Sequence, residues 1–324
     1  MHFLVLSVVA ILLSLATPAG AAGIRLIDIP ASGDSPAFRG IVWSPCAAAA
    51  ADVTLRDFVF SGARNCPVAG DKLPLIVISH GRTGWSGRHH DTAVVLADAG
   101  FVVVAIDHPI DSDRSKSKRI EDIAYLTERP ANIRRVIDFM LDESRFASSI
   151  DRRRIGFFGF SRGGYTGLVL VGGEPGRELA ERICARNATG TLCQQINEGK
   201  FPPAGYVHDS RIRAAVLADI APAFFFGPTE VASIKVPLLL WASEHGGRGA
   251  DARQIANIGR ALPSRTEVNI VPGAAHFVFL APCPVAEIKS DPEFCADANG
   301  VDRVAFHREF NAAALAFFRQ HLGI

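Results

Sequence analysis

A single serine, Ser161, stands among glycines in the stretch GFFGFSRGGYTG at residues 156–167. The nearest glycines, Gly159 and Gly163, complete the pattern G-x-S-x-G, and the apolar run RIGFFGF comes directly before it. Because glycine weakens the interior of a strand or helix, such a cluster indicates that the backbone turns sharply or approaches a neighbouring segment closely. A strand, a strained turn and a helix in this order hold a serine hydroxyl above a sheet. The sequence therefore predicts a nucleophile elbow at Ser161, with an accidental tight turn as the alternative.

A serine hydroxyl becomes a good nucleophile only beside a base, which is itself oriented by an acid. Behind an elbow of this kind, the expected order along the chain is serine, acid, histidine. His276 lies in the small-residue loop VPGAAHFVF, directly after the last predicted strand, and from there its ring can reach Ser161. We therefore expect His276 to be the base.

The acid has three candidates in the sequence. Asp219 ends the apolar strand AAVLADIAP at the same edge of the sheet as the elbow, where a carboxylate without a partner such as an imidazole would be costly. Glu244 and Asp251 belong to the loop SEHGGRGAD after the next strand, in which Gly246 takes the position where the acid most often stands. We expect Asp219 to be the acid, with Glu244 as the first alternative and Asp251 as the second.

Attack of a serine on a carbonyl group builds negative charge on the carbonyl oxygen, so hydrogen-bond donors must already point there. One donor is normally the backbone amide after the nucleophile, which is that of Arg162 here. The other should come from the loop HGRTGW after the strand LPLIVIS, where the amide of Arg82 is the better candidate. The sequence thus predicts an oxyanion hole formed by the amides of Arg82 and Arg162, with a plain strand-ending turn at residues 80–81 as the alternative.

From Leu73 onward, apolar runs of strand length alternate with helical stretches, the last at about residues 301–321. Strands buried on both faces lose the polar alternation of half-exposed strands, which favours a parallel sheet covered by helices on both sides. The expected fold class is α/β, with a mostly parallel, doubly wound sheet. Before residue 73, shorter strands are expected in IRLIDIP, FRGIVWS and VTLRDFVF, and the run DRRR at residues 151–154 is expected to be a solvated turn.

Residues 172–209 form a connection that is longer than a crossover needs and is interrupted by glycines and prolines. An insertion at this place would lie over the carboxyl ends of the strands, where open α/β sheets bind ligands. We expect a small cap, pinned by a disulfide between Cys184 and Cys193. The same length and composition also fit a plain surface loop.

The first residues, MHFLVLSVVAILLSLATPAGAAG, hold an apolar run from Phe3 to about Ala16, followed by small residues typical of a signal-peptide cleavage site. The run is shorter than the ~20 residues of a membrane-spanning helix, which disfavours a retained anchor as the alternative. We expect a secretory signal over residues 1–22, no stable membrane insertion after its cleavage, and one catalytic domain over residues 23–324.

The six cysteines fall into pairs of sequence neighbours, and in an exported protein they can oxidise. Each pair flanks a predicted loop, which favours local bridges over the other pairings that six cysteines allow. Buried free thiols are the alternative, which the signal segment disfavours. The expected location is periplasmic or extracellular, and the expected disulfides are Cys46–Cys66, Cys184–Cys193 and Cys283–Cys295.

Lysine and arginine number 34 and aspartate and glutamate 33, so the net charge of +1 provides no strong field to attract nucleic acid. The chain has no C-x-x-C pair, no histidine pair four residues apart and no H-E-x-x-H pattern. The stretches GRHHD and DHPIDSD mix histidine and aspartate without such spacing. We therefore expect a small-molecule substrate, no nucleic-acid partner, and no metal or other cofactor.

The stretches VISHGRTGW, GFFGFSRGGYTG, AVLADIAP, PLLLWASE and PGAAHFVF resemble the α/β-hydrolase superfamily. Within it, they look like the secreted platelet-activating-factor acetylhydrolase and dienelactone-hydrolase-like group, from about Leu73 to the C-terminus. In the acetylhydrolases the acid follows the strand after the elbow, which implies Asp219 here. The chain departs from lipases at Phe160, where they usually have histidine, and from dienelactone hydrolases at Ser161, where they use cysteine.

The resemblance and the candidate residues together imply a secreted serine hydrolase that cleaves carboxylic esters through an acyl-enzyme, without a metal. Short-chain or lipid-derived esters are the expected substrates. A peptidase or amidase would use the same three residues, and a non-catalytic binding module could keep the fold without the chemistry. Both alternatives stay open at the level of the sequence.

Overall fold

The computed structural model describes residues 21–323, apart from positions 57, 114, 116–118, 187–189, 204 and 298–299. Residues 1–20 of the predicted signal segment therefore lie outside the described residues. Among the described residues, no helix combines the length and the apolar character needed to cross a membrane.

The described strands form one ten-stranded sheet in the order β10-β9-β8-β7-β5-β6-β2-β1-β4-β3. The strands from β5 to β10 run parallel to one another, and β1 to β4 extend this sheet from β6 mainly by antiparallel pairing. The predicted α/β class with a mostly parallel sheet is confirmed. The strands are β1 (Gly23–Ile29), β2 (Phe38–Ser44), β3 (Ala51–Leu55), β4 (Phe58–Arg64), β5 (Leu73–Ser79), β6 (Val102–Ile106), β7 (Ile150–Phe160), β8 (Ile212–Ala218), β9 (Leu238–Ser243) and β10 (Val268–Val271).

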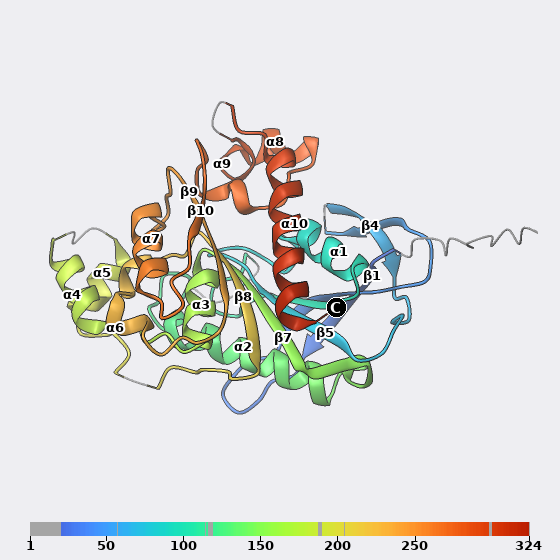
Figure 1. Cartoon of the computed structure of the whole chain (residues 1–324), viewed down its shortest axis with the longest axis horizontal. Helices are drawn as coiled ribbons and strands as arrows, with labels where there is room; N and C mark the ends of the chain where they lie inside the picture. Colours follow the sequence, from blue (N-terminus) through green and yellow to red (C-terminus); the bar gives the residue numbers. More distant parts are fainter. Residues whose placement is uncertain are drawn as a thin grey trace, which may run out of the picture.

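Helices cover both faces of the parallel strands, which is why the central strands are apolar over most of their length. Leu75 and Val77 of β5 pack on one face with α2, α3 and α7, whereas Ile76 and Ile78 pack on the other with α1 and α10. Helices α1 and α10 contact each other and lie side by side in Figure 1. The helices are α1 (His90–Asp98), α2 (Tyr125–Asp142), α3 (Arg162–Leu170), α4 (Arg177–Arg186), α5 (Thr191–Asn197), α6 (Pro228–Val231), α7 (Ala252–Ala261), α8 (Val285–Ser290), α9 (Pro292–Cys295) and α10 (Arg303–Leu322).

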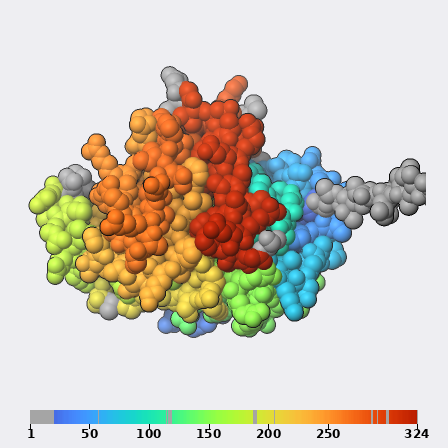
Figure 2. All heavy atoms as spheres, in the orientation of Figure 1, coloured from blue at the N-terminus to red at the C-terminus, as the bar shows by residue number. Residues whose placement is uncertain are grey.

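The C-terminal helix closes one face of the molecule. In Figure 2 its residues, in red, fill the surface between the N-terminal strands, in blue, and the orange segment that includes α7. The buried apolar side chains of α10 that pack on the sheet side are Phe306, Phe310, Ala314, Phe318 and Leu322. The spacing of four residues between them is that of one helix face.

Two short segments differ from the sequence-based expectation. VTLRDFVF is not one strand, because β3 ends at Leu55 and β4 begins at Phe58; Arg56, with φ 56°, helps the chain reverse between them. The run DRRR is not a turn but part of β7, which begins at Ile150 and has an irregular register against β5 at this point. The arginine side chains at this end of β7 extend into water, so in the sequence the start of the strand has the composition of a loop.

The strand order places a topological switch point between β5 and β7. From β5 the chain moves to β6 on one side, and it later returns to β7 on the other side of β5. Loops that leave the carboxyl ends of two such strands diverge, and the crevice between them is where doubly wound sheets bind ligands. Because Ser79 of β5 pairs with Gly159 of β7, the loop HGRTGW and the serine turn start beside each other.

The three predicted disulfides are confirmed, and all six cysteines are bridged. One bridge joins α4 to α5, so two short helices within residues 172–209 are linked covalently. The bridges are Cys46–Cys66, Cys184–Cys193 and Cys283–Cys295.

Candidate active site

Ser161 occupies the turn between β7 and α3, with φ 58° and ψ −118°. Residues with a side chain rarely adopt a positive φ, so this turn is strained and must be held by its surroundings. The amide of Ser161 donates to the carbonyl of Ala218 at 3.0 Å, and its carbonyl accepts from the amide of Ala221 at 3.1 Å. The chain therefore makes the sharp strand-to-helix turn that the glycine pattern predicts.

The flanking glycines are required by close backbone approaches. A Cβ at Gly159 would lie 2.2 Å from the carbonyl oxygen of Gly163, and a Cβ at Gly163 would lie 1.9 Å from the carbonyl oxygen of Ser79 in β5. Both distances are far below van der Waals contact, and backbone atoms in a packed sheet cannot move aside at low cost. The glycines thus allow α3 to begin directly against the sheet.

Gly163→Ala is expected to lower the free energy of unfolding by about 3 kcal/mol or more, because the added methyl group overlaps the β5 backbone. Gly33→Ala is the matched control. Gly33 has φ +53° and no atom within 4 Å of the added Cβ, so a loss of only about 1 kcal/mol from backbone strain is expected. Urea unfolding followed by circular dichroism measures both variants, and equal losses would contradict the close packing of the elbow.

Three side chains from three different loops meet beside the elbow. His276, at the start of the short 3-10 helix His276–Phe279 after β10, places Nε2 2.9 Å from Ser161 Oγ. Its Nδ1 lies 2.9 Å from Oδ2 of Asp219, the residue directly after β8. Ser161, His276 and Asp219 are 5%, 3% and 0% exposed. A carboxylate at Nδ1 holds the imidazole proton there and leaves Nε2 free to accept the proton of the serine hydroxyl.

Asp219 is held by a residue that reasoning from the sequence missed. Ser243, the last residue of β9, donates its amide to Asp219 Oδ1 at 2.7 Å and its hydroxyl to Oδ2 at 2.5 Å. A fully buried carboxylate needs such donors, and these supplement the contact with His276. Ala218 of β8 pairs with Trp241 of β9, which brings the end of β9 to Asp219. Adjacent parallel strands end at the same edge of the sheet, so the last residue of the strand after Asp219 could have been identified from the sequence as its neighbour.

The two alternative acids have other partners. The Glu244 carboxylate accepts from the amide of Gly273 at 2.6 Å in an exposed position. Asp251 is the N-cap of α7, where its side chain accepts from the amide of Gln254 at 2.9 Å. Of the three candidate acids, Asp219 is therefore the one whose carboxylate contacts the imidazole of His276.

The loop after β5 lies against the elbow. A Cβ at Gly81 would approach the Cβ of Ser161 to 3.1 Å, and Arg82 lines the same pocket as Ser161. Within the described part of the chain, the backbone amides of Arg82 and Arg162 donate to no protein group. Two uncommitted amides of residues that line the pocket with Ser161 can donate to a negatively charged oxygen that forms there.

A pocket of about 470 Å³ opens over Ser161. Two ion pairs border it, Arg82 with Glu121 and Arg248 with Glu293. Residues 190–192 of the disulfide-linked insertion also line it. Its aromatic and aliphatic lining residues are Tyr125, Phe160, Leu192, Ala221, Pro222, Phe224, Phe277 and Phe294.

A larger cavity, of about 910 Å³, lies away from these residues. It is lined mainly by the N-terminal strands and the loops after β5 and β6, with Phe38, Arg56 and Trp85 among its walls. None of the three converging side chains lines it. Size alone therefore does not identify the site, and the reactive groups at the smaller pocket do.

One group of potential metal ligands is close together within the described residues, formed by Cys283, Glu287 and Cys295. Its two sulfur atoms are joined to each other in a disulfide. A disulfide sulfur lacks the thiolate that binds metal ions, so this group is a structural link.

No protein-family model matches the chain, and no curated protein matches it. Among solved structures, the chain is similar to a ferulic acid esterase from Streptomyces cinnamoneus. The TM-score is 0.59 and the sequence identity 18%, and the similarity covers 95% of this chain and 91% of that chain. At this identity the similarity concerns the fold alone. It agrees with the mostly parallel sheet, and the chain has the α/β-hydrolase fold.

Proposed function

We propose that the protein is a serine hydrolase that cleaves carboxylic esters through an acyl-enzyme. The observation that carries this proposal is the chain of contacts from Ser161 Oγ to His276 Nε2 and from His276 Nδ1 to Asp219, each 2.9 Å long. Nucleophile, base and orienting acid at hydrogen-bond distance, under an open pocket, form an arrangement suited to acyl transfer. The non-catalytic alternative does not account for the strain maintained at Ser161.

In the acylation step, Ser161 Oγ attacks the ester carbonyl carbon while His276 Nε2 takes the hydroxyl proton. The negative charge that develops on the carbonyl oxygen is stabilised by the amides of Arg82 and Arg162. Asp219 stabilises the imidazolium through Nδ1. His276 then gives the proton to the leaving alcohol as the bond between the carbonyl carbon and the alcohol oxygen breaks.

In the deacylation step, water takes the place of the alcohol. His276 removes a proton from the water, whose oxygen attacks the acyl carbon, and the same two amides stabilise the second oxyanion. The imidazolium returns the proton to Ser161 Oγ as the acid leaves. The cycle consumes one water molecule per ester and ends with the original protonation states.

Short-chain or lipid-derived esters are the substrates we propose. The aromatic side chains of the 470 Å³ pocket favour an apolar acyl or alcohol group. Residues 172–209 serve as a cap in this proposal, since residues 190–192 line the pocket. The motifs from VISHGRTGW to PGAAHFVF support a place in the acetylhydrolase and dienelactone-hydrolase-like group.

We also propose that the protein is exported to the periplasm or the medium. The apolar run near the N-terminus has the pattern of a signal peptide. Three disulfides in a chain of this length are typical of proteins that fold in an oxidising compartment. Detection of the mature N-terminus in a secreted fraction tests this point.

The purified protein is expected to release nitrophenol from p-nitrophenyl acetate, butyrate and octanoate, and to hydrolyse the matching p-nitroanilides much more slowly. An ester has the better leaving group, whereas an amidase would need added means to protonate an amine. Methyl ferulate belongs in the panel because the similar structure is that of a ferulic acid esterase. Faster anilide cleavage would favour the peptidase or amidase alternative, and no turnover of any compound would favour a binding module.

A further inference from the structure

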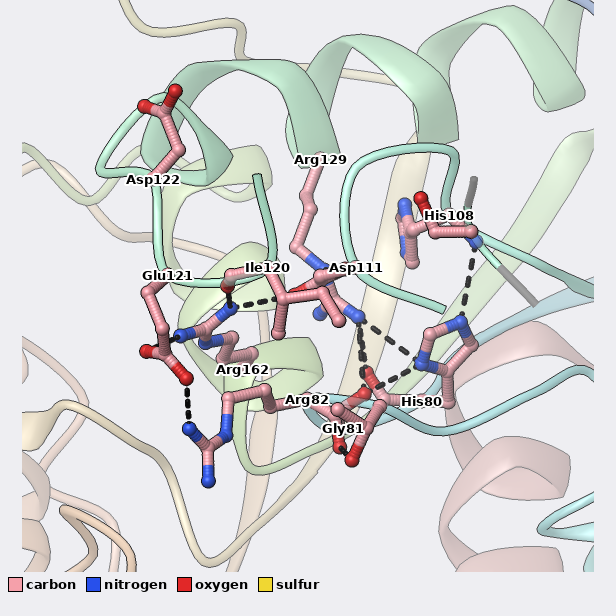
Figure 3. A network of polar contacts seen from close by, with 12 residues as sticks. His80, Gly81, Arg82, His108, Asp111, Ile120, Glu121, Asp122, Arg129 and Arg162 are labelled. Carbon is pink, nitrogen blue, oxygen red and sulfur yellow. Dashed lines mark hydrogen bonds and ion pairs between the residues drawn. The ribbon is translucent and has the colours of Figure 1, made fainter. Parts of the chain in front are cut away.

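A buried arginine contacts the loop after β5. Arg129, in the second turn of α2, is 0% exposed, and its Nη2 donates to the carbonyl oxygens of His80 at 2.7 Å and Gly81 at 3.3 Å (Figure 3). Its Nε donates to Oδ1 of Asp111 at 3.1 Å. A guanidinium is costly to bury unless it is paired and hydrogen-bonded. The partners here are a carboxylate and the backbone of a functional loop.

The ring of His80 adds a second donor to the Gly81 carbonyl. His80 Nε2 accepts the backbone N–H of His108 at 3.2 Å, which places the proton of the neutral ring on Nδ1. Arg129 Nη2 also lies 3.2 Å from Nδ1, and with the proton there it donates to the two carbonyl oxygens and not to the ring. Nδ1 lies 2.6 Å from the Gly81 oxygen. Burial and the nearby charge of Arg129 lower the pKa of His80 to about 3, which keeps the ring neutral. The Gly81 carbonyl is therefore held by the side chains of Arg129 and His80, and it also accepts from the amide of Gly84 at 3.2 Å.

These donors determine where the next amide points. The carbonyl of Gly81 and the N–H of Arg82 belong to one trans peptide unit, in which the two bonds point in opposite directions. Gly81 and Arg82 line the pocket over Ser161, and Arg129 lies behind them. With its carbonyl held against Arg129, this peptide directs the Arg82 N–H toward the pocket.

Asp111 links this arrangement to the second candidate donor. Its Oδ2 accepts from Arg162 Nη1 at 2.8 Å, and its backbone carbonyl accepts from the amide of Thr83 at 2.9 Å. Burial alone would raise the pKa of the Asp111 carboxyl, but the charges of Arg129 and Arg162 outweigh it and lower that pKa. The ionised carboxylate therefore connects Arg162 to the loop that carries the other amide, as Figure 3 shows.

From these contacts we propose that Arg129 is a positioning residue for the oxyanion hole, holding the Gly81–Arg82 peptide so that its N–H faces the ester oxygen. The inference rests on the proposed function. Arg129 contacts no substrate; it acts through the peptide before the ester arrives. Donors that are already oriented stabilise an oxyanion more than donors that must reorient, so Arg129 should affect the chemical step more than substrate binding.

Arg129→Lys tests this role. Lysine keeps the charge beside Asp111 but lacks the planar fork, so one ammonium group cannot bind Asp111 and both carbonyls at once. We expect kcat for p-nitrophenyl butyrate to fall by about 10- to 100-fold, with KM unchanged within about twofold. Arg134→Lys is the matched control, because Arg134 is exposed on the same helix, and it should retain the wild-type kcat. Rates are expressed per active site, counted by fluorophosphonate labelling.

A thiono ester separates positioning from a general loss of structure. Sulfur is a weak hydrogen-bond acceptor, so an oxyanion hole contributes little to cleavage of p-nitrophenyl thionobutyrate. The ratio of kcat/KM for the oxygen ester to that for the thiono ester should therefore fall in Arg129→Lys by about the same factor as kcat. Asp111→Asn keeps the shape of the side chain but weakens the contact with the Arg129 guanidinium, so it should lower the same ratio. This variant replaces Arg129→Lys in the test if Arg129→Lys does not fold.

An unchanged ratio, or a kcat for Arg129→Lys equal to that of Arg134→Lys, overturns the positioning role and leaves the proposed function intact. No ester turnover by the wild-type protein removes the proposed function and this inference with it. The two failures are thus separated by the wild-type measurement.

Discussion

Replacing Ser161 with alanine is expected to reduce kcat for ester hydrolysis by about 10⁶-fold. His276 Nε2 lies 2.9 Å from Ser161 Oγ, so the variant loses the nucleophile and keeps the base and the acid. Position 161 has φ 58°, and alanine has the same Cβ as serine and fits its space, so the fold should be retained. Release of nitrophenol from p-nitrophenyl butyrate measures the loss, and mass spectrometry should show no fluorophosphonate adduct on the variant.

Ser210→Ala is the matched control, because Ser210 is exposed in the turn before β8. It should keep both the wild-type kcat and the adduct. If Ser161→Ala retained turnover, or if the label remained after the substitution, another residue would be the nucleophile. The melting temperature of each variant verifies that the comparison is made between folded proteins.

Asp219→Asn is expected to lower kcat by about 10⁴-fold. The amide group of asparagine donates to His276 Nδ1, so the proton of the ring moves to Nε2. A protonated Nε2 can no longer accept the proton of the Ser161 hydroxyl. The asparagine side chain can still accept the amide of Ser243 through its carbonyl oxygen, so a folded protein is expected. Steady-state kinetics with p-nitrophenyl butyrate gives the size of the loss.

Glu244→Gln is the matched control for Asp219→Asn, since it makes the same change of carboxylate to amide one strand away. The Glu244 side chain accepts from Gly273 and does not contact His276, so kcat should stay close to that of the wild type. A larger loss in Glu244→Gln than in Asp219→Asn would reverse the assignment of the acid.

The signals that located the site in the sequence are local. The turn at Ser161 needs glycine at positions 159 and 163, because a Cβ atom at either position would overlap backbone atoms of a neighbouring segment. The spacing of these glycines can be seen directly in the sequence. The parallel strands are likewise visible, since helices on both faces require apolar residues at every position. The disulfides join sequence neighbours, and local loop closure could be anticipated.

The segments that were not anticipated depend on pairing. Whether VTLRDFVF forms one strand or two depends on how β3 and β4 pair across Arg56, and a residue pattern of period two is the same in both cases. The DRRR run joins β7 because β5 lies beside it, although its own composition favours a turn. The composition of a segment does not show which strand will lie beside it, and that strand decides whether the segment joins the sheet.

The sequence by itself determined the α/β class, the position of the turn at Ser161, the cysteine pairs and a short set of candidate acids. Only the tertiary structure decided which carboxylate meets His276, and it brought Ser243 and Arg129 to the site. The physical reason is that these contacts join residues far apart in the chain. Their distances follow from the register of adjacent parallel strands and from helices packed across them, which no short stretch of sequence specifies.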